Sequence, residues 1–425
     1  MKSTGSIGRR KADSSASLRN DNVERLRSDK QRGYRVMTSR KVFMMDLWAT
    51  VPYYTAYLSR ALLAEGVNLT VGSITYYLDA KCFTSRGIQN DPGLLDVVGR
   101  FRMPKLPRRV LKLAEAMLNL SALWVRFLFS PPDVVHVQYL PMLRWKVPLD
   151  WWFLRFCQRR GAAVVLTVHD LLPHDTAERY RQIFMRLYGV VDGLICHSEH
   201  IRMRLMEEFQ VPEKKIRVIP HGPFFYDLEN SNSSQRALED ASGKLLVLWQ
   251  GIIFPYKGID LLLDAWQLVE AAAPDALLVI AGTGAPELLD AIRCQVERLG
   301  LKQVRLRFQF ISTEELVALY RAADVVVYPY RAITTSGALA TGLALGRCIV
   351  ASDLPVFREL LTNGENALLV DPQNRECLSS ALIRLLGDSG LRERLQSNTK
   401  NMNFGDESWR SIAKSTLEAY ADFAT

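Results

Sequence analysis

Short apolar runs alternate with helix-length segments through the second half of this 425-residue sequence, and this alternation constrains the fold more than any other feature. Each run is rich in Val, Ile or Leu and is bounded by polar residues or glycine. Repeated βα units of this kind are typical of a doubly wound parallel sheet. The expected strands are 245–250, 276–281, 304–311, 324–328, 348–351 and 367–370, and the expected helices are 258–273, 286–299, 313–322, 337–345, 355–361 and 374–386.

The first half shows the same alternation less regularly. Its expected strands are 41–46, 67–76, 133–139, 162–169, 193–197 and 216–220, with a helix at 52–65. The polar stretch 227–243 breaks the pattern and is predicted to link two domains. The sequence therefore predicts an α/β protein with an N-terminal domain at 39–226, a C-terminal domain at 244–404 and a last helix within 405–425.

The net charge of +9 is concentrated at the N-terminus, because residues 1–41 hold 12 basic and 4 acidic side chains. The low apolar content there predicts a disordered basic tail at 1–38. The rest of the chain is close to neutral, so no nucleic-acid partner is expected. Six widely spaced cysteines and the lack of an apolar leader predict a cytoplasmic protein.

Two loops that follow expected strands carry candidate anion-binding groups. Lys257 stands just before a helix, so its ammonium and the free helix N–H groups would both face a bound anion. In the other loop, the hydroxylated residues 334–336 lead into Gly337, which lets backbone amides approach phosphate oxygens closely. Ser336 also suits a plain helix N-cap. Two such sites favour a diphosphate over a single phosphate.

All six histidines lie between His136 and His221. His169 ends an expected strand and is followed by Asp170, which places both at the ligand-binding edge of the sheet. His136 lies inside a strand, where a packed core histidine and a ligand contact both remain open. Neither zinc-type spacing nor D-x-D occurs, so no metal is expected. The isolated G-x-G at 282–284 does not indicate a dinucleotide, and no cofactor is expected.

Basic and aromatic residues are concentrated in one region of the first half. Residues 100–112 contain six bases and no acid, an apolar segment follows at 116–129, and 151–156 is rich in aromatic residues. This composition is typical of a patch that contacts an anionic membrane, which would be the inner face of the plasma membrane. A core helix flanked by a basic loop is the alternative.

Several motifs in the second half carry a family resemblance: KGIDLLLDA at 257–265, LVIAG at 278–282, LYRAADVVVYP at 319–329 and IVASD at 349–353. Their order and spacing resemble those of the family-4 glycosyltransferases, also called glycosyl transferases group 1. TVHD at 167–170 and VIPHG at 218–222 resemble the family's first domain less sharply. The resemblance covers most of residues 40–400.

The resemblance implies a GT-B fold, in which two Rossmann-like domains face a cleft and the last helix crosses back to the first domain. It also implies a metal-independent, retaining transfer of a sugar from a nucleotide-diphosphate donor, held mainly by the second domain. The acceptor, expected to be a lipid-linked or envelope glycan, would sit on the first domain. We expect the catalytic residues to be Lys257 and His169. The diphosphate would be bound by Lys257, Ser336, Gly337, Ala338 and Leu339, and the residues near the donor sugar or ribose would be Asp170, Thr334, Thr335 and Thr341. The acceptor side would include Tyr53, Tyr54 and His136.

Three features depart from the family pattern. The family's arginine five residues before the lysine is Ile252 here, and its pair of glutamates falls on Ile333 and Thr341. The glycine-rich loop of the first domain is replaced by TVPYY at 50–54. The glutamates normally touch the donor sugar and ribose. Two alternatives to a transferase therefore stay open: a non-catalytic GT-B scaffold or binding subunit, and a nucleotide-sugar epimerase.

Overall fold

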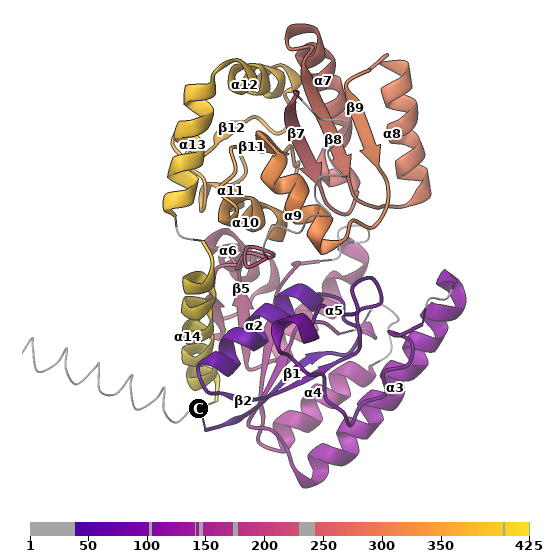
Figure 1. The fold of residues 1–425 in the computed structure, drawn as a ribbon. Coiled ribbons are helices and arrows are strands. Elements are labelled where there is room, and N and C mark those ends of the chain that lie inside the picture. The colour runs from indigo at the N-terminus through magenta and orange to yellow at the C-terminus, as the bar shows by residue number, and fades with distance from the viewer. Residues whose placement is uncertain are drawn as a thin grey trace, which may run out of the picture.

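The computed structural model describes residues 39–101, 104–140, 142–143, 148–172, 177–228, 243–402 and 404–424. The predicted tail at 1–38 and most of the predicted linker lie outside these ranges. Figure 1 shows two α/β lobes, one above the other, each with its own sheet. Among the described residues, we find no helix with both the length and the apolar character that crossing a membrane requires.

The N-terminal sheet has six parallel strands in the order β2-β1-β3-β4-β5-β6. Its interior strands are apolar and buried because helices cover both faces, as expected for a parallel sheet. The strands are β1 (Lys41–Asp46), β2 (Asn68–Ser73), β3 (Val134–Val137), β4 (Ala163–Thr167), β5 (Gly193–Cys196) and β6 (Ile216–Val218).

The C-terminal sheet also has six parallel strands, in the order β12-β11-β10-β7-β8-β9. The order reverses around β7, so this is a doubly wound sheet with a topological switch point. Together the two sheets confirm the predicted pair of Rossmann-like domains. The strands are β7 (Leu245–Gln250), β8 (Ala276–Ala281), β9 (Val304–Arg307), β10 (Val325–Tyr328), β11 (Ile349–Ser352) and β12 (Leu368–Val370).

The helices fall between these strands. In the N-terminal domain they are α2 (Pro52–Ala64), α3 (Lys105–Phe129), α4 (Leu149–Arg159), α5 (Ala177–Val190) and α6 (Glu199–Phe209). The C-terminal half holds α7 (Ile259–Ala272), α8 (Pro286–Arg298), α9 (Thr313–Ala322), α10 (Gly337–Ala344), α11 (Pro355–Arg358), α12 (Arg375–Gly387), α13 (Ser389–Asn401) and α14 (Asp406–Phe423).

Several local expectations differ from the structure. The expected strand 67–76 ends at Ser73, and the expected helix 355–361 ends at Arg358. The expected strand 304–311 ends at Arg307, because its partner β8 ends at Ala281 and offers no further ladder. Helix α13 was not predicted, since its sequence is mostly polar. The spacing of Ser312 and Glu315 predicts a capping box at the start of α9, but only half of it forms. The Ser312 hydroxyl accepts from the Glu315 N–H at 3.2 Å, but the Glu315 carboxylate pairs with Arg307 at 3.0 Å.

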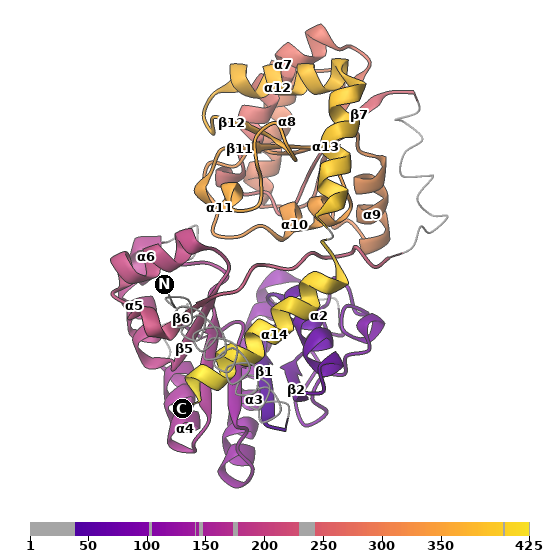
Figure 2. The ribbon, with the colours of Figure 1, turned by 90° about the vertical axis from the view of Figure 1, so that its left-hand side faces the viewer.

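The last helix, α14, packs on the N-terminal domain although it follows the C-terminal domain in sequence, as Figure 2 shows. Trp409, Leu417 and Tyr420 are buried in the same core cluster as Tyr57 of α2. The Trp409 ring stacks on Tyr57 at 5.5 Å, and its indole N–H donates to the Pro223 carbonyl at 2.8 Å. Burial of each such side chain stabilises this packing by about 1.5–3 kcal/mol.

Candidate active site

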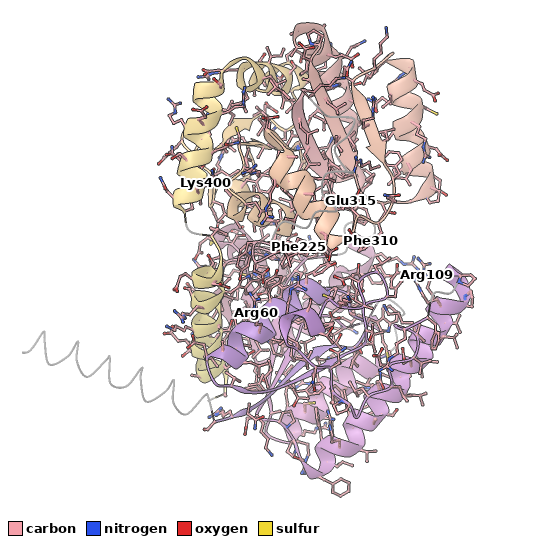
Figure 3. All side chains as sticks on the ribbon, in the orientation of Figure 1. Arg60, Arg109, Phe225, Phe310, Glu315 and Lys400 are labelled. Carbon is pink, nitrogen blue, oxygen red and sulfur yellow. The ribbon has the colours of Figure 1, made fainter. Side chains whose placement is uncertain are left out.

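A cavity of about 470 Å³ lies between the domains, and its lining residues follow strands of both sheets. A smaller hollow of about 250 Å³ adjoins it. Open parallel sheets bind ligands at this carboxyl edge of their strands. Figure 3 labels Phe225 and Phe310, two lining residues, where the lobes meet. The cavity and the hollow share Asp170, Lys257, Thr335, Gly337 and Ala338.

Two glycines make close approaches around Lys257, one to its side chain and one to a backbone carbonyl. Gly251 has φ of 143°, and a Cβ there would lie 2.8 Å from Lys257 Nζ. Gly258, at φ 66°, lies against the Pro329 carbonyl, where a Cβ would approach to 1.9 Å. Burial lowers the pKa of Lys257 from 10.5 to about 8, and Asp170 opposes part of that shift. The free site therefore holds a poorly solvated ammonium that a bound anion would stabilise.

The N-terminus of α10 opens on the same space. Ser336 caps the helix, since its hydroxyl accepts from the Leu339 N–H at 3.1 Å. The N–H groups of Gly337 and Ala338 precede the first helical hydrogen bond and have no acceptor within the helix. The Leu339 amide is thus used by the cap, and its side chain is buried away from the cavity. Gly337 and Ala338 are the amides that can reach an anion.

The three threonines near α10 have different surroundings. Thr335 lines both spaces, whereas Thr334 is buried and lines neither. The Thr341 hydroxyl donates to the Gly337 carbonyl at 2.8 Å and accepts from the Phe224 N–H at 3.2 Å. Thr341 therefore ties the start of α10 to the loop that follows β6 in the other domain.

His169 belongs to a cluster of rings around Tyr54. The Tyr54 ring lies 4.8 Å from His169, 5.2 Å from His197 and 5.0 Å from His221, centroid to centroid. Burial lowers the pKa of His197 to about 4 and that of His221 to about 3, and it lowers the pKa of His169 well below 6.5. All three imidazoles are therefore neutral near pH 7.

A buried chain of hydrogen bonds leads from His169 to the last helix. The His169 Nε2–H donates to Gln138 Oε1 at 3.0 Å, because an amide oxygen can only accept. The Gln138 amide group donates to His136 Nε2 at 3.1 Å, and His136 Nδ1 lies 2.6 Å from the Tyr420 hydroxyl. This order leaves His169 Nδ1 with its lone pair. His136 is fully buried in β3 and does not line the cavity, and this chain of hydrogen bonds connects it to His169, which does.

Aromatic side chains form the wall on the N-terminal side. Tyr53 and Tyr54 line the cavity, and the Tyr53 hydroxyl donates to Asp79 at 3.0 Å. Phe224 and Phe225 line it as well, and neither was singled out in the sequence. The signal was present, because both closely follow the VIPHG motif at 218–222. Gln138, two residues after His136, was also missed.

Groups of three or more His, Cys, Asp or Glu side chains that could hold a metal ion are absent from the described residues. The candidate site offers a cationic side chain, helix amides and neutral imidazoles.

Comparison with known proteins identifies the family. The pattern described as "Glycosyl transferases group 1" matches residues 231–402, and that of "Glycosyltransferase Family 4" matches residues 51–222. The phosphatidyl-myo-inositol mannosyltransferase of Mycobacterium leprae is 32% identical over 280 residues, which cover 65% of this chain and 71% of that protein. The chain belongs to the family-4 glycosyltransferases.

Further relatives and solved structures also match this family-4 glycosyltransferase. The uncharacterized glycosyltransferase MJ1607 of Methanocaldococcus jannaschii is 28% identical over 233 residues, which cover 53% of this chain but only 59% of that protein. Anabaena Alr3699/HepE, solved with UDP and glucose, has a TM-score of 0.69 at 16% identity and covers 89% of this chain and 99% of its own. Sucrose-phosphate synthase of Thermosynechococcus elongatus has a TM-score of 0.67 at 19% identity, with 90% and 98% covered. These structures confirm the GT-B fold.

The departures of this family-4 glycosyltransferase from the family pattern all lie at the cleft. Ile252 is 57% exposed and lines the cavity. Ile333 lines the smaller hollow and packs against core clusters of both domains. Thr341 holds the interdomain hydrogen bond described above. Ile333 and Thr341 therefore join the two domains at positions where the family pattern has glutamates.

Proposed function

We propose that this glycosyltransferase moves a sugar from a nucleotide-diphosphate donor to a glycan or lipid-linked acceptor. The observation that carries the proposal is that Lys257, Gly337 and Ala338 line both the cavity and the adjoining hollow. The Anabaena structure contains UDP and glucose, and the Mycobacterium leprae relative is named a mannosyltransferase, which supports a nucleotide-sugar donor here.

The proposed mechanism is electrostatic. As the bond to the sugar breaks, negative charge grows on the diphosphate. An ammonium and two helix amides aimed at that charge stabilise the transition state more than the ground state. Lys257 and α10 would supply this charge without a divalent cation or a cofactor. For the stereochemistry we follow the family resemblance and propose retention.

We place the acceptor against the aromatic wall of the N-terminal domain, formed by Tyr53, Tyr54 and Phe224. The mycobacterial relative is named for phosphatidyl-myo-inositol, a lipid, which supports a lipid-linked acceptor. His169 would contact the donor sugar through its free Nδ1 lone pair, with Asp170 and Thr335 beside it. Six free cysteines, four of them buried, fit a reducing compartment, and we propose the cytoplasmic side of a membrane.

Lys257→Ala tests the proposal. Isothermal titration with UDP-glucose, GDP-mannose and ADP-glucose first identifies the donor, and release of the nucleoside diphosphate then measures turnover. We expect Lys257→Ala to lower kcat/KM about a hundredfold or more, as loss of one preorganised donor does in other enzymes. Lys302→Ala, at an exposed lysine far from the cavity, is the matched control.

Other outcomes would contradict the proposal. Near-normal turnover by Lys257→Ala would remove the electrostatic assignment. Failure to bind any nucleotide sugar would favour a scaffold or binding subunit. An epimerised donor formed without acceptor would favour a nucleotide-sugar epimerase. Inversion at the anomeric carbon, read by NMR of the product, would overturn the proposed retention, and loss of turnover in chelator would overturn metal independence.

A further inference from the structure

Helix α3 exposes an apolar face that no described element covers. Among its described side chains, the exposed positions from 110 to 129 are all apolar or small, and none is charged. Phe129 is 85% exposed, Val110 65% and Val125 60%. Monomeric soluble proteins rarely present a contiguous apolar surface of this kind without a partner.

These exposed residues form one stripe. At 100° per residue they occupy about 140° of the helix, and at 1.5 Å per residue they extend about 28 Å along it. We call this the α3 strip and define it by Val110, Met117, Leu118, Val125, Leu128 and Phe129. Figure 1 shows α3 along the outer edge of the N-terminal domain, with no other element on its outer side.

Helix α4 extends the α3 strip with aromatic and basic side chains. A surface hollow of about 660 Å³ is lined by Trp124 of α3 and by Trp152, Arg155 and Arg159 of α4. Trp124 is four residues before Leu128 and seven after Met117, so it lies on that side of the helix. Trp152 is 51% exposed, and the Arg155 guanidinium lies 5.4 Å from the Trp151 ring centroid.

The exposed charges on α3 and α4 themselves have one sign. The only acids in the two helices are Glu115 and Asp150, and both are buried. Arg109, Arg155 and Arg159 are exposed. Figure 3 shows Arg109 at the end of α3 that points toward the C-terminal lobe. The surface is therefore apolar in the middle and basic at its borders.

We propose that the α3 strip and the adjoining α4 residues dock this protein on an anionic lipid bilayer. Apolar side chains would enter the interface, tryptophans would sit at headgroup depth, and arginines would meet anionic headgroups. A second copy of the chain fits less well, because a twofold contact places the same surface on both sides and brings like charges together. The docking surface lies outside the cleft, so this proposal does not depend on which sugar the cleft transfers.

Co-sedimentation of the full chain with vesicles tests the docking. We expect binding to vesicles of phosphatidylcholine and phosphatidylglycerol in equal parts, and much weaker binding to phosphatidylcholine alone. Leu118→Glu with Val125→Glu should lower the partition coefficient at least about tenfold, since both carboxylates would face the acyl region. Leu63→Glu with Met203→Glu, at two exposed apolar residues on other helices, is the matched control and should bind normally.

A second pair of changes tests the basic border. Arg155→Ala with Arg159→Ala should reduce binding to the anionic vesicles and flatten its dependence on salt. Circular dichroism and nucleotide-sugar binding, measured on the same samples, separate loss of docking from loss of the fold or of the proposed transfer.

Three results would overturn the docking. Full binding by Leu118→Glu with Val125→Glu would assign membrane attraction to another part of the chain, such as its basic N-terminal residues. Equal binding to both vesicle types would contradict the role of the arginines. A dimer in sedimentation velocity that the two glutamates dissociate, without vesicle binding by the unchanged protein, would make the α3 strip an interface between copies.

Discussion

At the scale of single residues, the protonation of Lys257 governs how the proposed diphosphate site responds to pH. Burial holds the pKa of its ammonium near 8, against 10.5 in the unfolded chain. The unfolded state therefore binds more protons between pH 8 and 10.5, and the free protein should become more stable as pH rises through that window. A bound anion reverses the preference and favours the charged form.

We predict that affinity for the nucleoside diphosphate is flat below pH 8 and falls above it by about tenfold per pH unit, because the lysine must then take up a proton to bind. Titration calorimetry from pH 6.5 to 9.5 measures this. Lys257→Ala should bind more weakly with a flat profile. A falling profile in that variant would assign the titration to another group.

At the scale of elements, the cap of α10 orients the two amides that we assign to the diphosphate. Ser336 and Ser312 cap α10 and α9 with similar hydrogen bonds, 3.1 Å and 3.2 Å long. They thus form a matched pair of which only one borders the smaller hollow.

Replacing either serine by alanine should lower the free energy of unfolding by about 1 kcal/mol. Only Ser336→Ala should also weaken donor binding, by about fivefold, because the first turn of α10 loses its fixed orientation. Thermal unfolding and titration calorimetry on both variants check this. Equal loss of donor affinity in both would show that general stability, not the α10 terminus, controls binding.

At the scale of the whole molecule, contacts between the domains hold the cleft in its observed shape. The Glu359 carboxylate of the C-terminal domain accepts from the backbone N–H groups of Glu199 and His200, at 2.9 Å and 3.0 Å. These amides form the N-terminus of α6, where negative charge is favourable. Arg60 of α2 pairs with Asp227 at 2.5 Å and with Asp406 at 3.3 Å. These two acids lie where the chain leaves the N-terminal domain and where it returns to it.

Glu359→Ala should therefore shift the molecule toward domain separation without unfolding either domain. Because the contact is partly exposed, we expect a loss of about 1 kcal/mol, or about fivefold in the ratio of separated to touching domains. Small-angle scattering should show a larger radius of gyration than in Glu297→Ala, an exposed glutamate on α8 that serves as control. An unchanged radius would mean that other contacts dominate.

The two sheets and the loops around Lys257 and Gly337 were predictable from the sequence. The spacing of apolar residues is a local signal that identifies the strands and helices. Because open parallel sheets bind ligands at the carboxyl ends of their strands, the residues that follow each strand are then expected near a ligand. The same rule brought His169 and Asp170 to the cavity edge. Helix α13 was not predictable in this way, because its polar composition carries little periodic signal.

What the sequence could not determine are the contacts between residues that lie far apart along the chain. The hydrogen bond between His136 and Tyr420 spans 284 positions, and the bond of Thr341 to Phe224 spans 117. The tautomer of His169 and the uncovered α3 strip likewise follow from how helices and domains pack. Sequence periodicity specifies which face of an element is apolar, but only the tertiary structure decides what covers that face.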